Sequence, residues 1–229
     1  MKEILFIALT LFFMLSFAQT VNTENVKSDA SAAFTELASS SNVAKWRNTV
    51  ASNASSIVSI KSSFKQVKTL SFLSQKVTSG GRFFFEKSEN GNKLKWEYTT
   101  PFFYTIVING NNITMKDGQK ISSFDMSTSR VFQEINEIMV ASLNGTILSD
   151  KGNFIFDIKE KGRELTISMT PVKGTSLSEY FRNINMIMDK SDFTVSMLTM
   201  VEITGDSTEL LFIDKKLNGK IDESEFSVK

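Results

Sequence analysis

The stretch between Gly80 and Gly110 constrains the fold of this chain more than any other. It contains three short aromatic-rich runs, separated by residues that favour turns. In the middle run, Leu94, Trp96 and Tyr98 alternate with charged residues. Strict alternation of this kind is typical of a β-strand with one apolar face and one solvated face. Large aromatic side chains on one face of an antiparallel sheet must pack against an apolar surface. This surface belongs either to the protein's own core or to a hydrophobic ligand.

The first residues have the features of a targeting segment. A positive start with Lys2 is followed by an apolar run from Ile4 to Phe17 and then by a small-x-small sequence. This pattern predicts a cleaved secretory signal peptide over residues 1–18, with an uncleaved anchor as the alternative. Residues 19–42 are rich in serine, alanine, threonine and asparagine, which predicts a flexible leader. We therefore expect an exported protein.

The chain contains no cysteine and no histidine. An exported domain without disulfides needs a real hydrophobic core, and the chain is long enough to build one. The lack of histidine excludes Ser-His-Asp and Cys-His sites and nearly all catalytic zinc sites. Hydrolysis by paired carboxylates is still open, but no pair stands out in a recognisable setting. A net charge of +1 gives no indication of nucleic-acid binding. We expect neither an enzyme nor a cofactor.

Two segments have the periodicity of a helix, whereas in the remaining segments apolar and polar residues alternate as in a β-strand. Apolar residues recur every three or four positions from Val43 to Ile57 and from Thr128 to Leu143, which predicts two amphipathic helices. Period-two patterns predict strands over residues 60–70, 82–86, 93–99, 102–108, 112–117, 121–125, 153–159, 164–170, 181–189, 194–203, 208–214 and 224–228. The sequence therefore predicts one domain over residues 43–229, a long antiparallel sheet with one helix before it and one within it. The inserted helix must cover one face of that sheet.

Several landmarks follow one another in a recognisable order. Ser63 to Gln66 reads SFKQ, Lys95 to Pro101 reads KWEYTTP, Ile106 to Gly110 reads IVING, and Met169 to Pro171 reads MTP. In this order they resemble the S-F-x-Q, W-x-x-x-x-P, apolar D/N-G and L-x-P segments of the LolA family of periplasmic outer-membrane lipoprotein carriers. The resemblance covers residues 43–229 and suggests a Bacteroidetes-like member.

The resemblance implies a mainly β fold with α-helices, an unclosed antiparallel β half-barrel covered by helices that encloses a hydrophobic cavity. It implies a carrier that binds lipoprotein acyl chains and ferries lipoproteins from the inner to the outer membrane. The implied partners are acylated lipoproteins, a lipoprotein-releasing ABC transporter and an outer-membrane acceptor, and we expect a monomer. In proteobacterial relatives an arginine holds the lid closed. Its nearest counterpart here is Lys87, which lacks the planar fork of hydrogen-bond donors.

On this basis we expect two sets of site residues. The wall of the acyl-chain cavity would consist of Phe83, Phe85, Leu94, Trp96, Tyr98, Met115, Met169, Met186 and Met188. The lid would consist of Val131, Ile135, Ile138 and Met139. Thioether side chains adapt to irregular apolar shapes, which suits a cavity for varied acyl chains, but the same residues also suit an ordinary core. A carrier of another lipid or of a polyene precursor, and a lipoprotein-binding envelope sensor, are the functional alternatives.

Asp214 to Glu225 imitates a calcium-binding loop. Several of its oxygen-bearing residues match the spacing of an EF-hand, but Lys216 occupies a ligand position and the flanking segments are predicted strands. We therefore expect no metal site and interpret Asn218-Gly219 as the turn of a β-hairpin.

Overall fold

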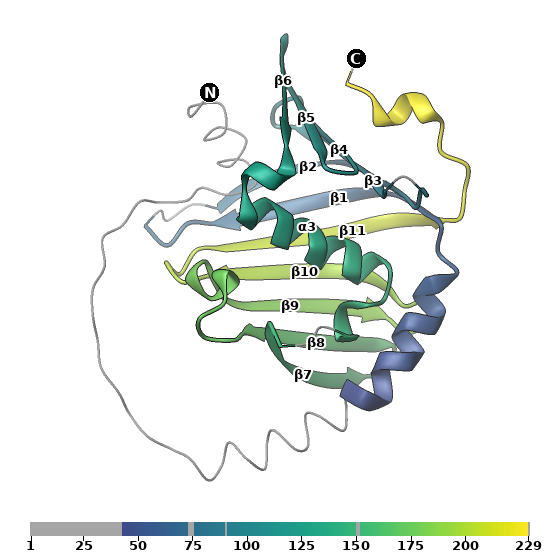
Figure 1. Ribbon diagram of the computed structural model, residues 1–229, viewed down its shortest axis with the longest axis vertical. Coiled ribbons are helices and arrows are strands. Elements are labelled where there is room, and N and C mark those ends of the chain that lie inside the picture. The colour runs from purple at the N-terminus through teal and green to yellow at the C-terminus, as the bar shows by residue number, and fades with distance from the viewer. Residues whose placement is uncertain (1–42, 73–75, 90, 150–151, 229) are drawn as a thin grey trace. The chain divides into compact units, whose positions relative to one another are not determined.

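The structure is a computed structural model that describes residues 43–72, 76–89, 91–149 and 152–228 (Figure 1). The chain divides into two units, Met1–Leu37 and Ala38–Lys229, and the fold and the site lie in the second. The predicted signal peptide and leader lie outside the described residues. No helix in the described part of the chain is long and apolar enough to cross a membrane.

The second unit is built on one antiparallel sheet of eleven strands in the order β6-β5-β4-β3-β2-β1-β11-β10-β9-β8-β7. The strands are β1 (Ser59–Thr69), β2 (Lys76–Glu86), β3 (Lys93–Thr100), β4 (Tyr104–Asn109), β5 (Asn112–Asp117), β6 (Lys120–Asp125), β7 (Phe154–Lys161), β8 (Glu164–Pro171), β9 (Phe181–Asp189), β10 (Thr194–Glu202) and β11 (Ser207–Leu217). Two meanders, β1 to β6 and β7 to β11, are joined by the pairing of β1 with β11. The sheet is unclosed, with β6 and β7 as its edges, as predicted.

Most predicted strands are confirmed, two of them with identical bounds at residues 112–117 and 181–189. Strand β2 begins six residues earlier than predicted, because its glycine-rich start pairs with β1. The predicted strand over residues 102–108 begins only at Tyr104. Phe102 and Phe103 lie instead in the β3–β4 connection, with 71% and 77% of their surface exposed.

The predicted strand over residues 224–228 is wrong. That segment forms a 3-10 helix, η4 (Glu223–Phe226), whose first turn is capped by Asp222 through a 3.0 Å hydrogen bond from the backbone N–H of Ser224. The side chain of Phe226 packs with Phe84, Val107 and Ile221. This contact covers Phe84 of β2 and Val107 of β4 on the outer side of the sheet.

The predicted hairpin at Asn218-Gly219 is therefore also wrong. Asn218 ends β11 with a positive φ of 58°. Its side-chain oxygen accepts a 2.8 Å hydrogen bond from the backbone N–H of Val58, and its amide donates to the carbonyl of Ser56 at 3.1 Å. The asparagine thus joins the end of β11 to the segment that precedes β1.

Both predicted helices are present. The first covers residues 43–55. The second, α3 (Arg130–Leu143), follows the edge strand β6 through η1 (Met126–Thr128) and leads to the opposite edge strand β7 through η2 (Ile147–Ser149). Because the chain has to pass from one edge of the sheet to the other, α3 lies across one face of it (Figure 1). We call this covered side the inner face.

The two helices meet at Gly145, just past the end of α3. Gly145 has a φ of +70°, and a Cβ at this position would lie 2.5 Å from the Cβ of Ala54 and 2.6 Å from the carbonyl oxygen of Val50. Only glycine allows both this backbone conformation and this close approach. The glycine therefore sets how near the first helix comes to the end of α3.

Candidate functional site

The predicted alternation in β3 is confirmed. Trp96 lies opposite Phe83 and Leu94 lies opposite Phe85 across the β2–β3 pair, so these four side chains share one face. All four are buried, and Trp96 is only 2% exposed. Tyr98, two residues further along β3, lies on the same face opposite Tyr104 of β4. The inner face of this half of the sheet is thus a continuous aromatic wall.

The opposite face of β3 was expected to be exposed to solvent, but one of its residues is not. Lys95 is buried as well, because the C-terminal segment covers it. Its ammonium lies 3.3 Å from a carboxylate oxygen of Glu97 and 3.6 Å from one of Glu225. Glu225, which belongs to the segment that imitates an EF-hand, is therefore used in an ion pair with Lys95.

Two further aromatic residues belong to the wall and were missed from the sequence. Phe64 of β1 makes an edge-on contact with Trp96 at a centroid distance of 5.1 Å, and Phe212 of β11 lies 5.4 Å from Phe83. Phe83 and Trp96 themselves are 4.5 Å apart. The period-two pattern of β1 already indicated the orientation of Phe64, whereas only the pairing of β1 with β11 brings Phe212 to this place.

The methionines continue the inner face on the other half of the sheet. Met169 of β8 and Met186 and Met188 of β9 are fully buried. In register, Met186 lies opposite Ile167 and Leu198 on the two neighbouring strands. Met115 of β5, in the first half of the sheet, is buried too, and its sulfur accepts a 3.1 Å hydrogen bond from the hydroxyl of Tyr104.

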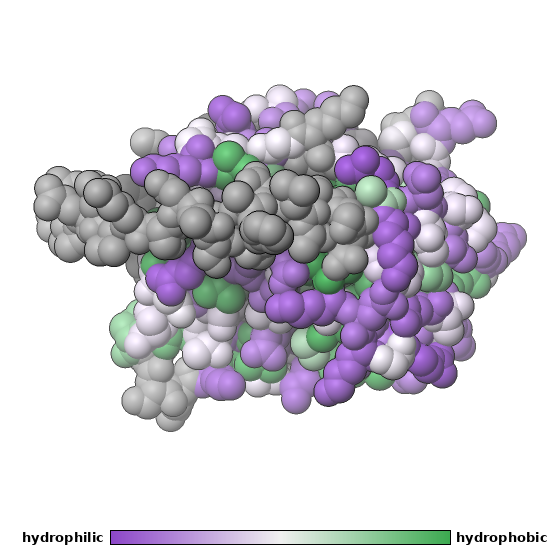
Figure 2. Space-filling model, turned by 90° about the horizontal axis from the view of Figure 1, so that it is seen from below, coloured by the Kyte–Doolittle hydropathy of each residue, from purple (hydrophilic) through white to green (hydrophobic). Residues whose placement is uncertain are grey.

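Figure 2, which views the molecule from below, shows a mainly polar surface with small apolar patches.

Helix α3 covers this wall with its apolar side. Of the residues predicted to form a lid, Ile135, Ile138 and Met139 are buried, while the side chain of Val131 lies outside the described part of the structure. Phe132, which the sequence analysis did not select, packs against Phe124 of β6 at a centroid distance of 5.7 Å. Helix α3 is thus packed onto the sheet.

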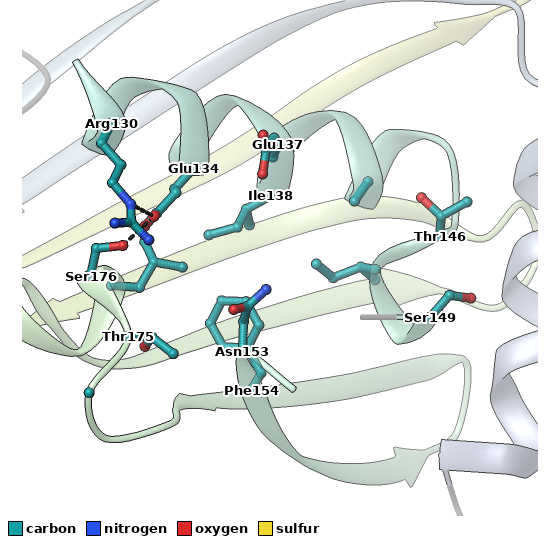
Figure 3. A pocket seen from close by; sticks show the side chains of 14 residues that line it. Arg130, Glu134, Glu137, Ile138, Thr146, Ser149, Asn153, Phe154, Thr175 and Ser176 are labelled. Atoms are coloured by element: carbon teal, nitrogen blue, oxygen red, sulfur yellow. Dashed lines mark hydrogen bonds and ion pairs between the residues drawn. The ribbon is translucent and has the colours of Figure 1, made fainter. Parts of the chain in front are cut away.

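Two of the pockets in the described part of the structure lie outside the packed wall. The larger, with a volume of about 660 Å³, lies between α3, the start of β7 and the β8–β9 connection (Figure 3). The smaller, of about 540 Å³, lies at the β3–β4 end of the sheet. Among the predicted site residues, Ile138 lines the larger pocket and Tyr98 the smaller. The other eight wall residues line neither, because they pack against one another and beneath α3.

The family model described as outer membrane lipoprotein carrier protein LolA matches residues 55–229. The chain belongs to the LolA family. Its unclosed eleven-stranded sheet with two helices is the LolA-like fold.

Solved structures with this fold share little sequence with the chain. A crystal structure of MucB matches with a TM-score of 0.52 and 10% identity, over 82% of this chain and 63% of that one. A chain of the Pseudomonas aeruginosa MucA/MucB complex matches with a TM-score of 0.51 and 10% identity, over 82% of this chain and 61% of that one. The chain thus spans about three fifths of these proteins. A putative outer membrane lipoprotein-sorting protein domain from Vibrio parahaemolyticus matches with a TM-score of 0.42 and 11% identity, over 81% and 94%. A search of curated proteins found no match.

In this LolA-family chain, one end of the inner face is polar. Tyr98 donates a 2.8 Å hydrogen bond to the side chain of Gln66, and the ammonium of Lys68 lies 2.8 Å from the carboxylate of Glu202. Gln66 and Lys68 belong to β1, whereas Glu202 ends β10. All four side chains are buried, so the ion pair is shielded from water and depends on both partners.

Burial also changes the acidity of the phenols at this end. It raises the pKa of the Tyr98 hydroxyl far above its ordinary value, and the nearby Tyr104 adds to the effect. Burial raises the pKa of Tyr104 as well, with a contribution from the Asp117 carboxylate. Both phenols are therefore neutral hydrogen-bond donors at any physiological pH.

Nothing in the described residues resembles a metal centre. They contain no group of three or more histidine, cysteine, aspartate or glutamate side chains that could hold an ion. Within the loop that imitates an EF-hand, the Asp222 side chain caps η4 and Glu225 pairs with Lys95. These two candidate ligands are thus engaged in local structure.

Proposed function

We propose that this protein is a periplasmic carrier that binds the acyl chains of lipoproteins and ferries lipoproteins from the inner to the outer membrane. The observation that carries the proposal is an apolar inner face, covered by an inserted helix, in a chain of the LolA family. An inner-membrane lipoprotein-releasing ABC transporter and an outer-membrane acceptor would be its partners. The role is transport without catalysis.

The physical need for such a carrier follows from the hydrophobic effect. Each methylene exposed to water costs about 0.8 kcal/mol, so an acylated anchor does not leave a membrane without a shield. Phe83, Phe85, Trp96 and the three methionines of β8 and β9 offer adaptable apolar surface of the required kind. Acyl chains would replace the contacts that α3 makes with this wall.

Loading then requires α3 to move, and the helix lacks side-chain capping at its start and charge partners for its dipole at either end. The N-cap residue Ser129 makes no side-chain capping hydrogen bond. The first turn carries no acidic residue and the last turn no basic residue, so the helix dipole has no charge partner there. A helix held mainly by one apolar face opens locally at low cost when that face finds another partner.

The two tryptophans allow a direct test. Trp96 lies in the wall, whereas Trp46 lies in the first helix and packs against Phe193 at 6.2 Å. In a Trp46→Phe variant, the fluorescence of Trp96 should be quenched by a brominated fatty acid, because bromine quenches on contact. A Trp96→Phe variant keeps only Trp46 and serves as the matched control. Equal quenching in the two variants, or none in either, would contradict acyl binding at the wall.

The nature of the cargo needs a second measurement. Native mass spectrometry of protein purified from the periplasm should show a bound mass equal to an acylated protein or its lipid-modified terminus. A bound polyene or a free lipid alone would favour the other lipid carriers of this fold. Empty protein that nevertheless binds a membrane partner would favour an envelope sensor.

A further inference from the structure

The groove between α3 and the β8–β9 connection contains a carboxylate, that of Glu134, in which one of the two oxygens has no hydrogen-bond donor among the described residues. One oxygen of Glu134, Oε1, accepts a 2.9 Å hydrogen bond from Nε of Arg130 and a second from the hydroxyl of Ser176 (Figure 3). The other oxygen, Oε2, is buried and accepts no hydrogen bond from any described residue. A buried carboxylate oxygen without a donor is unfavourable, so the site favours a ligand that brings one.

Arg130 does not supply this donor firmly. Its side chain is 77% exposed and belongs to the same helix as Glu134, four residues away. An exposed pair of this kind contributes little to stability and is screened by salt. A cation arriving in the groove can therefore displace Arg130 at little cost and pair with Glu134 itself. Because Glu137 also lines the groove, its charged residues sum to one negative charge.

The shape of the groove indicates what carries this cation. Its lining runs along α3 from Arg130 to Ala141, which are eleven positions apart. At 1.5 Å per residue this corresponds to about 16 Å. An extended peptide advances about 3.3 Å per residue, so about five residues fit along the groove. Thr175 and Asn153 offer polar groups to a peptide backbone, and Leu177 offers an apolar contact.

We propose that this groove binds a short extended peptide segment whose lysine or arginine side chain pairs with Glu134. The proposal rests on the carrier function for the source of the peptide, which is the polypeptide that follows the acylated end of a bound lipoprotein. The wall would hold the acyl chains and the groove would hold the first residues of the protein part. Glu134 also joins α3 to η3 (Ser176–Glu179), because it accepts a hydrogen bond from the hydroxyl of Ser176.

The test uses the full chain and a lipid-free fluorescent peptide with one central lysine between serines and glycines. Fluorescence anisotropy should show binding to the wild type and about tenfold weaker binding to Glu134→Gln, which loses one charge-assisted hydrogen bond. Glu179→Gln is the matched control, because Glu179 is an exposed residue of η3 that does not line the groove. The Glu179→Gln variant should bind the lysine peptide as tightly as the wild type does. A peptide with glutamate in place of the lysine should bind neither to the wild type nor to this variant.

Nuclear magnetic resonance of the wild type provides a readout that does not depend on a variant. The lysine peptide should shift the amide signals of Thr175 and Ser176. Absence of binding, equal binding by wild type and Glu134→Gln, or shifts confined to other regions would overturn the proposal. Butylammonium that binds as tightly as the peptide would reduce the groove to a simple cation site and would also overturn it. Quenching of Trp96 by brominated fatty acid is measured separately, so failure of the groove is distinguishable from failure of the carrier function.

Discussion

The ammonium of Lys87 donates a hydrogen bond to the carbonyl oxygen of Ala54 at 3.2 Å, and a second of the same length to that of Ser55. These carbonyls lie at the C-terminal end of the first helix, where backbone acceptors lack partners within the helix and the dipole attracts a cation. Partial burial at this place lowers the pKa of Lys87. Lys87 thus holds the C-terminal end of the first helix through two hydrogen bonds.

Replacement of Lys87 by methionine should loosen this helix. The loss of two hydrogen bonds and of the dipole interaction predicts a decrease of about 1 kcal/mol in the free energy of unfolding. Backbone amides of residues 50–55 should exchange faster in hydrogen-exchange measurements, while those of β8 and β9 stay protected. Lys65→Met, which alters an exposed lysine of β1, is the control. Unchanged exchange at residues 50–55 would show that packing alone holds the helix.

The close contact at Gly145 predicts a second effect. Gly145→Ala forces an unfavourable φ and drives a methyl group into Ala54 and Val50, so it should lower stability by about 3 kcal/mol. Gly118→Ala has a similar φ of +56° but meets nothing within 4 Å. It should therefore cost only about 1 kcal/mol. Urea unfolding of both variants measures the difference, and equal losses would show that the helix contact is not tight.

Much of the fold is readable from the sequence because local patterns dominate it. Alternation predicted β3 and placed Leu94, Trp96 and Tyr98 on one face, and the 3.6-residue period predicted both helices. These signals are strong where one face is buried and the other is wet. The order of strands in the sheet was not predicted, because pairing of β1 with β11 joins residues about 150 positions apart and leaves no local pattern.

The wrong predictions have a common physical cause. Apolar and polar residues alternate in the C-terminal segment as they do in a strand. Its apolar side chain Phe226, however, packs against Phe84 on the outer face of the sheet. Lys95 was expected in water and is buried under this same segment. Tertiary contacts of this kind override local preference and cannot be seen in a single sequence. The groove at Glu134 escaped notice for the same reason, because only the folded chain brings residues 174–177 beside α3 and the start of β7.

The C-terminal plug should contribute strongly to stability. Phe226→Ala removes a buried ring and leaves a cavity against Phe84 and Val107, which predicts a loss of about 3 kcal/mol. Phe102→Ala alters a phenylalanine that is mostly exposed and should change stability by no more than about 0.5 kcal/mol. Thermal unfolding followed by circular dichroism compares the two. A similar melting temperature for both variants would mean that the C-terminal segment is only loosely attached.

The ion pair between Lys68 and Glu202 should behave as a buried unit. Lys68→Met leaves the carboxylate of Glu202 buried without its cation, so stability should fall by about 3–5 kcal/mol. Adding Glu202→Leu should recover most of this loss, because the uncompensated charge is then gone. Lys159→Met, which removes an exposed pair with Asp157, should change stability by less than about 1 kcal/mol. Additive effects of the two substitutions in a double-mutant cycle would contradict a coupled pair.

The buried phenols of Tyr98 and Tyr104 predict a loss of stability at alkaline pH. Both have a pKa raised by burial above the ordinary value of 10, which the unfolded chain retains. Below about pH 10 both states keep their protons and stability is unaffected. Above it the unfolded chain releases protons that the folded protein holds, so the free energy of unfolding falls by about 1.4 kcal/mol per pH unit for each phenol. Urea unfolding between pH 9 and 11 should therefore show a free energy of unfolding that falls with pH. In the Tyr98→Phe variant the slope of this fall should be about half as steep. The same slope in the variant would mean that Tyr98 ionises as easily in the folded protein as in the unfolded chain.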